Sequence, residues 1–355
     1  PSWIKVKNVS KKKRISTVPM LMVNDFESII PIERDNIPPL NIGIIAMRTL
    51  FHSQEIFMIS LRILNHWNIN DFVGTGTKSL NLISTDIKDL TDDKNILIYK
   101  NEYELLHGFC NLIDKFDIDI LCSYGLTMFH LPNLLKRMKE NDVDQWWKIG
   151  RLKRLVSPYF DKFNITMSLS GRIPCDVSIC CQKSISAKSN DLSAAVQTEF
   201  GFYRQQIDHL ELTEELKDPK QLLNLIKYNS RDTLFVAQLL NALEILPLCF
   251  HISQISGCLL ARVMLGHPSF RCESLFLKYF HENGFVIPDK VIAKYKKESA
   301  FPGGMVLQPK RGFYETCILC LDFSSLYPSI IIEYNICFTT VDINNPSKRI
   351  NNNHK

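Results

Sequence analysis

An aspartate near the carboxyl end of the chain is the residue with the clearest chemical use. Residues 318–321 (Ile-Leu-Cys-Leu) predict a buried strand, and Asp322 follows it directly. Pro328 predicts the first turn of a helix, where proline is tolerated. A strand that leads through a turn into a helix places a carboxylate beside free backbone N–H groups. Such a junction can hold a divalent cation and a triphosphate side by side.

The longer string around this aspartate is similar to a known motif. Residues 322–330 (DFSSLYPSI) and 333–341 (EYNICFTTV) resemble the first palm motif of family B DNA polymerases, and the second string is most similar to the alpha branch, which works with primase. The resemblance implies a DNA polymerase that uses two Mg²⁺ ions. It also implies a DNA template, an RNA–DNA primer and dNTP as binding partners, primase and accessory polymerase subunits as protein partners, and a nuclear location.

The same resemblance implies roles for individual residues. Asp322 would be the catalytic residue and a metal ligand, and the backbone carbonyl of Phe323 would be a second ligand. The backbone N–H groups of the turn would receive the phosphates, and the ring of Tyr327 would exclude a 2′-hydroxyl. The nucleotide-binding set is Phe323, Ser324, Ser325, Leu326 and Tyr327, and the DNA-binding set is Gly303, Gly304, Lys310 and Arg311. Taken alone, Asp322 could equally be a turn aspartate or a helix N-cap.

A second candidate site lies between residues 37 and 245, which resemble the 3′–5′ exonuclease domain of the same family. Active members hold two metals with four carboxylates. Here the first motif reads Ala46-Met47-Arg48, and His130 stands where the family has an aspartate. Only Asp232 matches, four residues after Tyr228. One carboxylate of four predicts a nuclease fold without nuclease activity. The simpler interpretations are that His130 is a polar residue at a strand-to-helix turn and that Asp232 is a hydrogen-bonded helix residue.

Hydrophobic periodicity predicts the elements that would position these residues. Strands are expected at 40–50, 55–63, 95–99 and 118–121, and helices at 102–115, 131–138, 222–245 (one or two helices), 252–265 and 273–281. Interleaved strands and helices predict a mixed α/β fold. We expect the end of an N-terminal domain (1–36), an inactive ribonuclease H-like exonuclease-type domain with a mixed sheet and flanking helices (37–245), a helical connector (246–299) and the start of a polymerase palm (300–355).

Composition limits the remaining possibilities. Apolar residues are 45% of the chain and charged residues 22%, which is typical of globular domains, and the net charge of +5 is compatible with nucleic acid. The basic run Lys11–Arg14 is interpreted as a solvated loop in preference to a nuclear import signal. Residues 147–154 are either a basic patch beside an aromatic residue, suited to phosphate contact, or a solvated loop. Cys317 and Cys320 are expected to be buried free thiols in the strand, in a reducing compartment. No membrane span is expected.

Three functions remain open. The first is part of a replicative polymerase that extends RNA–DNA primers without proofreading, in which this chain alone, expected to be a fragment, would be inactive. The second is a proofreading family B polymerase or 3′–5′ exonuclease. The third is a non-catalytic remnant that binds nucleic acid.

Overall fold

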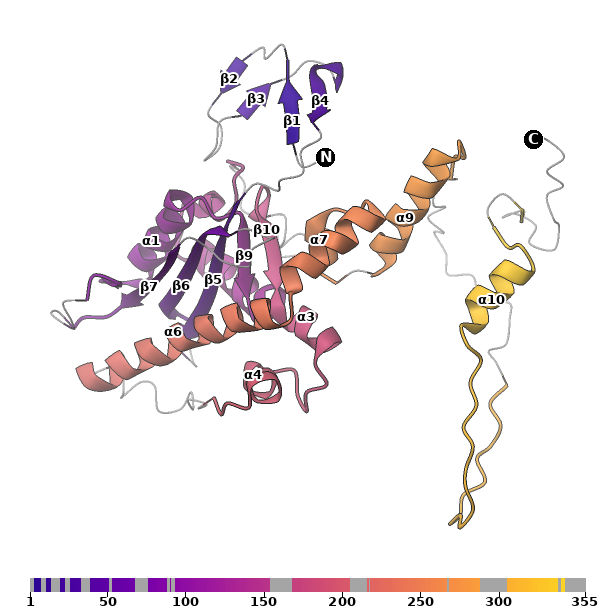
Figure 1. Cartoon of the computed structure of the whole chain (residues 1–355). Coiled ribbons are helices and arrows are strands. Elements are labelled where there is room, and N and C mark those ends of the chain that lie inside the picture. Colours follow the sequence, from indigo (N-terminus) through magenta and orange to yellow (C-terminus); the bar gives the residue numbers. More distant parts are fainter. Residues whose placement is uncertain are drawn as a thin grey trace. The chain divides into compact units, whose positions relative to one another are not determined.

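A computed structural model describes the chain as two compact units, residues 1–275 and 276–355, each of which is considered by itself (Figure 1). The residues described are 3–7, 11–13, 20–22, 26–32, 39–50, 53–67, 76–87, 90, 93–153, 168–204, 216, 218–266, 268–287, 305–337 and 340–341. The first unit carries the candidate nuclease site.

A six-stranded mixed sheet forms the centre of the first unit. In spatial order its strands are β10 (Ile173–Asp176), β9 (Ile120–Ser123), β5 (Leu40–Thr49), β6 (Ile56–Trp67), β7 (Gly76–Ser84) and β8 (Ile96–Tyr99). The β5–β6 and β6–β7 pairs are antiparallel, whereas β5–β9, β9–β10 and β7–β8 are parallel. The predicted mixed α/β fold is confirmed, and so is the expected pair of strands at 40–50 and 55–63.

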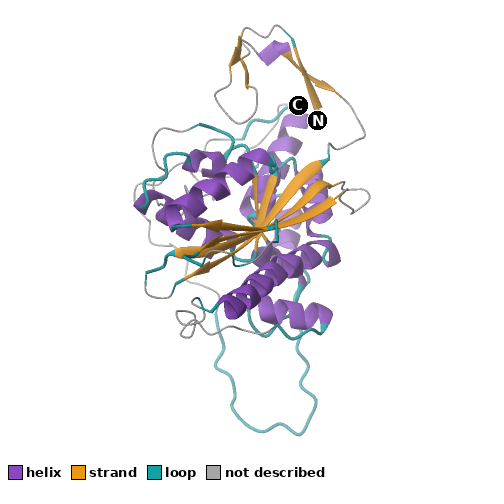
Figure 2. Ribbon diagram, turned by 90° about the vertical axis from the view of Figure 1, so that its left-hand side faces the viewer, coloured by secondary structure: helices purple, strands orange, loops and turns teal. Residues whose placement is uncertain are grey.

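Helices cover both faces of this sheet, as Figures 1 and 2 show. On one face, α1 (Glu102–Lys115), α2 (Leu131–Glu140) and the 3₁₀ turn Trp146–Ile149 pack on Ile45 and Met47. On the other, α6 (Pro219–Ala242), α3 (Val177–Ser184) and α4 (Leu192–Phe200) pack on Ile42 and Ile44. Successive side chains of a strand point to opposite faces, so β5 divides its even and odd residues between the two cores. Arg48 therefore faces α6.

The helices α1, α2 and α6 agree with their predicted positions, but the next helical stretch is interrupted. Residues 252–265 were expected to form one helix, whereas α7 (Ile245–Ser256) ends at Gly257 and α8 (Leu260–Met264) begins three residues later. Gly257 adopts φ 68°, a conformation that terminates a helix at low cost only for glycine. The following helix, α9 (Pro268–Glu282), begins before the predicted Glu273.

No single helix in the described part of the chain has the length and hydropathy needed to cross a membrane. The pair α6 and α7, bent by 48° at their junction, passes that test only jointly.

The N-terminal residues form two small antiparallel sheets. β1 (Trp3–Val6) pairs with β4 (Ile29–Ile32), which follows a 3₁₀ turn at Phe26–Ser28, and β2 (Lys11–Lys13) pairs with β3 (Met20–Met22). The loop predicted for the basic run is therefore wrong at residues 11–13, because backbone pairing with β3 makes them a strand. Arg14 lies outside the described residues.

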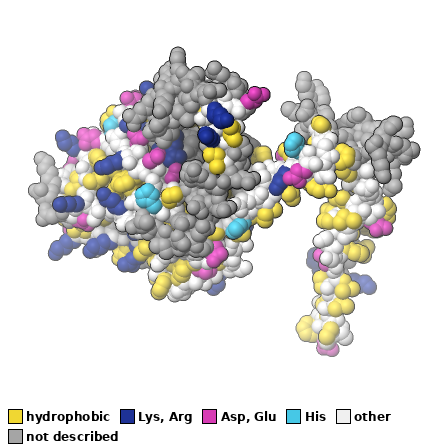
Figure 3. Space-filling model, turned by 45° about the horizontal axis from the view of Figure 1, so that its top comes forward, with side chains coloured by type: hydrophobic (Ala, Val, Ile, Leu, Met, Phe, Trp, Pro, Cys, Tyr) yellow, Lys and Arg dark blue, Asp and Glu magenta, His cyan; other side chains and the backbone are white. Residues whose placement is uncertain are grey.

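The second unit corrects the prediction of a buried strand before Asp322. Residues 305–325 contain no strand, and Ile318, Leu319 and Leu321 are 73%, 81% and 82% exposed. Cys317 and Cys320 are exposed as well, so the expectation of buried thiols is wrong. Figure 3 shows hydrophobic side chains at the surface of this segment. A strand forms only where neighbours complete its hydrogen bonds and cover its apolar side chains, and no partner strand occurs in the part of this unit that is described. The only helix described after residue 305 is α10 (Leu326–Glu333), which begins close to the predicted position.

A buried glutamate joins the elements on the α1 face. Glu102 Oε1 accepts hydrogen bonds from the backbone N–H of Ile56 (2.7 Å) and from Arg137 Nε (2.8 Å), and its Oε2 accepts from Asn141 (2.9 Å). A second bond to Oε2 comes from Arg137 Nη2. The carboxylate thus connects the start of β6 to α1 and α2.

We predict that Glu102→Ala lowers the free energy of unfolding by about 3–5 kcal/mol, because the backbone N–H of Ile56 and two donors of Arg137 lose their acceptor, and Arg137 keeps only the half-exposed Glu140 as a partner. Urea denaturation followed by tryptophan fluorescence tests this, since all four tryptophans lie in the first unit. The matched control is Lys136→Ala, which breaks an exposed ion pair with Glu140 and should cost less than about 1 kcal/mol. Equal losses in the two variants would contradict the role of Glu102.

Candidate functional site

The residues assigned to the exonuclease-like site meet on the α6 face of the sheet. Arg48 comes from β5, Asp232 from the middle of α6 and His130 from the turn that follows β9. Asp232 lies on a buried stripe of α6 that includes Asn229, Thr233 and Val236, at the i, i+3, i+4 spacing of a helix face that packs on a sheet. The structure therefore brings together the degenerate motif positions that the sequence had suggested separately.

Two arginines form ion pairs with the carboxylate of Asp232. Arg48 Nη2 lies 2.9 Å from Asp232 Oδ2. Arg204, which follows α4, donates from Nε to Oδ1 (2.7 Å) and from Nη2 to Oδ2 (2.8 Å), a bidentate pair. The side chains are mostly covered, with exposures of 15% for Arg48, 11% for Asp232 and 17% for Arg204. Both carboxylate oxygens of Asp232 are thus bound by guanidinium groups.

Asn229 holds Arg48 in place. Its Nδ2 donates to the carbonyl oxygen of Ala46 (3.1 Å) and to Ser60 Oγ (2.8 Å), and its Oδ1 accepts from Arg48 Nε (3.3 Å). Ser60 in turn donates to Asn81 Oδ1 (2.6 Å). Because Asn229 is fully buried with its amide fixed by three partners, the guanidinium is directed toward Asp232.

Electrostatics keep this cluster cationic. Burial lowers the pKa of Arg48, with the attraction of Asp232 opposing that effect. The hydrogen bond to Asp232 raises the pKa of Arg204. Arginine stays protonated in proteins, so two positive groups face one negative group.

His130 adds no charge at neutral pH. It ends a π-helical turn (Leu126–His130) that starts after Gly125, whose φ of 77° suits glycine. The hydroxyl of Ser123 donates to the carbonyl of Ile45 (2.8 Å) and also contacts His130 Nδ1. A hydroxyl has a single proton, so His130 must donate its own Nδ1–H to Ser123. Burial lowers the pKa of His130 to about 4.

A nearby buried aspartate shapes this turn. Asp176, at the end of β10, accepts from the backbone N–H of Gly125 (3.0 Å), from the backbone N–H of Thr127 (2.8 Å) and from Thr127 Oγ1 (2.7 Å). It also caps α3 through Ser178. Its carboxylate is therefore used to hold the turn between β9 and α2.

The donor set does not fit two metal ions. Ala46 supplies no ligand, the cation Arg48 lies on Asp232, and Asp176 is saturated by hydrogen-bond donors. Among the described residues, no group of three or more His, Cys, Asp or Glu side chains could hold a metal. A cluster of this kind can bind an anion, but it lacks the bridged carboxylates that hydrolysis by two metals requires.

Arg204, Asn229 and Asp176 were not found from the sequence. Asn229 lies three residues before Asp232 in the matched motif, so its place on the same helix face was a usable signal. Arg204 lies 28 residues from Asp232 on another element, and no spacing rule connects them.

The polymerase-motif residues are placed individually and are not assembled into a site. Phe323 and Tyr327 are 76% and 78% exposed, and Ser325, in the left-handed region at φ 52°, precedes α10. The N–H groups of the first turn of α10 are thus at a helix start, as predicted, beside Asp322 in sequence. Among the described residues, Asp322 belongs to no group of three or more side chains that could hold a metal, and one carboxylate does not fit a pair of Mg²⁺ ions. Lys310 and Arg311 are exposed and lie in a stretch without helix or strand. Gly303 and Gly304 lie outside the described residues.

Three basic side chains of the stretch 147–154 already have partners within the chain. Arg151 pairs with Asp117 (2.9 Å) and Asp119 (2.6 Å), and the ammonium of Lys153 lies over the ring of Trp147. Lys148 donates to Asn111 Oδ1 (2.7 Å). The interpretation as an open phosphate-binding patch is therefore wrong for Arg151, whose charge is used to hold the start of β9.

Comparison with known proteins identifies the class. A model of the "DNA polymerase family B, exonuclease domain" matches residues 1–195, more than half of the chain, and one of "DNA polymerase family B" matches residues 258–355. The chain belongs to the family B DNA polymerases.

Within that family it is similar to DNA polymerase alpha catalytic subunits. The mouse protein is 31% identical over 390 residues, which cover 96% of this chain and 26% of the mouse protein. The Xenopus laevis protein is 37% identical over 277 residues (71% of this chain, 19% of the frog protein), and that of Dictyostelium discoideum is 29% identical over 378 residues (96% and 24%). The chain thus spans about a quarter or less of the length of these relatives.

We predict that Asp232→Asn destabilises the first unit by about 3–5 kcal/mol, because Arg48 and Arg204 then face each other without a counter-charge. Urea denaturation measures the loss. Glu140→Gln is the matched control: it removes the charge of a carboxylate that is 44% exposed and pairs with Lys136 and Arg137, and it should cost about 0–1 kcal/mol. A loss in Asp232→Asn no larger than that of the control would show that the two arginines do not depend on the carboxylate.

The low pKa of His130 predicts loss of stability in acid. The folded pKa of about 4 is below the unfolded value of 6.5, so between these values the unfolded chain binds the extra proton. Stability is complete above pH 6.5 and falls as the pH drops toward 4, by about 3 kcal/mol from this group.

The measurement is the free energy of unfolding against pH for the unaltered chain and for His130→Gln, which keeps a donor for Ser123. The unaltered chain should lose more stability than the variant across this window. Parallel curves would show that the imidazole is not shifted.

Proposed function

We propose that this chain is part of a replicative, alpha-type DNA-directed DNA polymerase, which extends RNA–DNA primers by two-metal nucleotidyl transfer without proofreading. The observation that carries the proposal is the pairing of Asp232 with Arg48 and Arg204, because it replaces metal ligation at the exonuclease-like site. The family membership and the DFSSLYPSI string support the polymerase half of the proposal. We further propose that residues 37–245 form a ribonuclease H-like exonuclease-type domain retained for its fold.

In the complete enzyme, Asp322 would supply one carboxylate, and the backbone carbonyl of Phe323 another ligand, to two Mg²⁺ ions that activate the primer hydroxyl and clamp the triphosphate. The N–H groups of residues 324–327 would receive the phosphates, since they lie at the start of α10. Tyr327 would select deoxyribose by steric exclusion of a 2′-hydroxyl. Gly303, Gly304, Lys310 and Arg311 would contact DNA. Primase and accessory subunits would be partners, and the location nuclear, as proposals from the similarity to the alpha subunits.

The test is a 3′–5′ exonuclease assay of this chain on 5′-labelled single-stranded DNA with Mg²⁺ or Mn²⁺. We expect no shortening of the labelled strand. Asp232→Ala is the matched control, because it removes the one retained acid. Cleavage that disappears in Asp232→Ala, with circular dichroism showing that the variant is folded, would mean that the proofreading alternative is right. Extension of a primer by the chain alone with Mg²⁺ and dNTPs would contradict the incomplete polymerase site.

A second candidate function is non-catalytic binding of nucleic acid, and one observation favours it. The cationic cluster is flanked in sequence by exposed aromatics: Phe129 (71% exposed) precedes His130, and Tyr203 (85% exposed) precedes Arg204. Guanidinium groups suit phosphates, and exposed rings suit unstacked bases. The cluster could therefore hold a strand that it does not cut.

We expect fluorescence anisotropy with a labelled oligonucleotide to report binding that falls with salt. Tyr203→Ala should weaken it by about 1–3 kcal/mol, the usual worth of one stacked base. The exposed Ile255, on α7, is a control whose change to alanine should have little effect. Binding that is unaltered in Tyr203→Ala would remove this candidate.

A further inference from the structure

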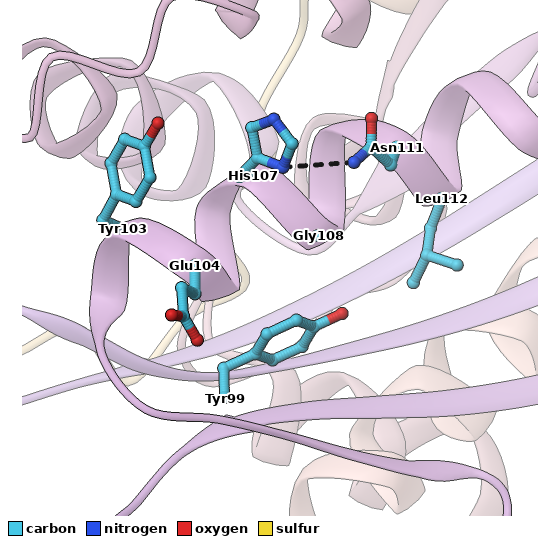
Figure 4. A pocket seen from close by; sticks show the side chains of 7 residues that line it. All are labelled: Tyr99, Tyr103, Glu104, His107, Gly108, Asn111 and Leu112. Carbon is cyan, nitrogen blue, oxygen red and sulfur yellow. Dashed lines mark hydrogen bonds between the residues drawn. The ribbon is translucent and has the colours of Figure 1, made fainter.

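A pocket unrelated to either site lies on the opposite side of the sheet from α6. It has a volume of about 450 Å³ and is formed where α1 crosses the edge strand β8. Its lining comes from two stripes of α1 at helical spacing and from the last residue of β8. The lining residues are Tyr99, Tyr103, Glu104, His107, Gly108, Asn111 and Leu112 (Figure 4).

Glycine at position 108 is what allows this pocket to exist. A Cβ at that position would lie 2.3 Å from the hydroxyl oxygen of Tyr99. The missing side chain lets the ring of Tyr99 lie across the surface of α1, beside Glu104 (Figure 4). A second aromatic surface is provided by Tyr103, 42% exposed, whose ring stacks with that of His107 at a centroid distance of 6.2 Å.

The hydrogen bonds fix which lining groups carry charge. Lys148 Nζ donates to Asn111 Oδ1 (2.7 Å), which directs the Nδ2 of Asn111 toward His107 Nδ1 (3.2 Å). Since an amide nitrogen only donates, His107 Nδ1 is the acceptor and the imidazole is neutral in this arrangement. Lys148 keeps its positive charge, because the amide is neutral, but it is not among the residues that line the pocket. The ionised group among the lining residues is therefore the carboxylate of Glu104.

That carboxylate has no counter-ion in the described part of the chain. Its Oε2 accepts a hydrogen bond from the backbone N–H of Lys100 (3.3 Å), and no ion pair involves it. An unpaired carboxylate between two tyrosine rings attracts a planar cation. The carboxylate can accept hydrogen bonds from the edge of the cation, and the tyrosine rings can stack on its faces. The same charge disfavours a phosphate.

We propose that this pocket binds the guanidinium of an arginine side chain presented by a partner protein. The position at β8 suits an extended partner segment, because β8 is the end strand of the sheet and one of its edges has no strand partner among the described residues.

The test uses the whole chain with ¹³C-labelled tyrosine rings and the peptide acetyl-Gly-Arg-Gly-amide as the probe. Titration should shift the ring resonances of Tyr99 and Tyr103, with weak affinity because a single side chain is bound. The same peptide with citrulline, which is uncharged and isosteric, should bind roughly tenfold more weakly, because it loses both the ion pair and the cation–π contact.

Glu104→Gln keeps the acceptor for Lys100 and removes the charge, so it should weaken binding about three- to fivefold. Glu199→Gln, at an exposed glutamate of α4, is the matched control and should bind as the unaltered chain does. Gly108→Ala should abolish binding by forcing Tyr99 into the pocket, with circular dichroism used to verify its fold. Equal binding of the arginine and citrulline peptides, or unaltered binding in Glu104→Gln, would overturn the proposal. So would stronger shifts of these tyrosines with dAMP, which would indicate a nucleotide site.

Discussion

The pairing of Asp232 with Arg48 and Arg204 is the interaction on which the α6 face depends. A carboxylate that is mostly covered needs compensating charge, and metal ions or protein cations can supply it. In this chain the cations are guanidinium groups from β5 and from the segment after α4. They join β5, α6 and the segment after α4, which are distant in sequence. Asn229 fixes the position of the Arg48 side chain by hydrogen bonds to Arg48 and to the backbone of Ala46. The same contacts that stabilise this face leave no oxygen of Asp232 available for a metal.

Because side chains alternate along β5, this strand contributes different residues to the two faces of the sheet. Arg48 shares the face of Ile42 and Ile44 that packs on α6, whereas Ile45 and Met47 support α1. The cationic cluster and the pocket beside Tyr99 therefore lie on opposite sides of one sheet. Glu102 ties α1 to β6 and α2 in the same way that Asp176 ties the turn after β9 to β10. Buried carboxylates are used here for structure, and each is surrounded by donors from separate elements.

The palm-motif segment illustrates a different constraint. Its sequence has the pattern of a buried strand, yet Ile318, Leu319 and Leu321 are exposed, because a strand gains stability only from neighbours that pair with it. The helix α10 does form near its predicted position, since a helix satisfies its backbone hydrogen bonds within its own segment. The palm motif can thus be recognised in the sequence even though the described residues do not assemble a polymerase site around it.

The sequence alone determined the family, the mixed α/β class and the positions of β5, β6, α1, α2 and α6, and it predicts that Ala46, Arg48 and His130 stand where nuclease acids would be. These follow from local periodicity and from motif spacing, which depend on neighbours along the chain. Only the tertiary structure decided that Arg48 and Arg204 both bind Asp232, and that Gly108 leaves room for a pocket beside Tyr99. These contacts join elements far apart in sequence, and which side chains meet is set by strand order and by the faces on which helices pack.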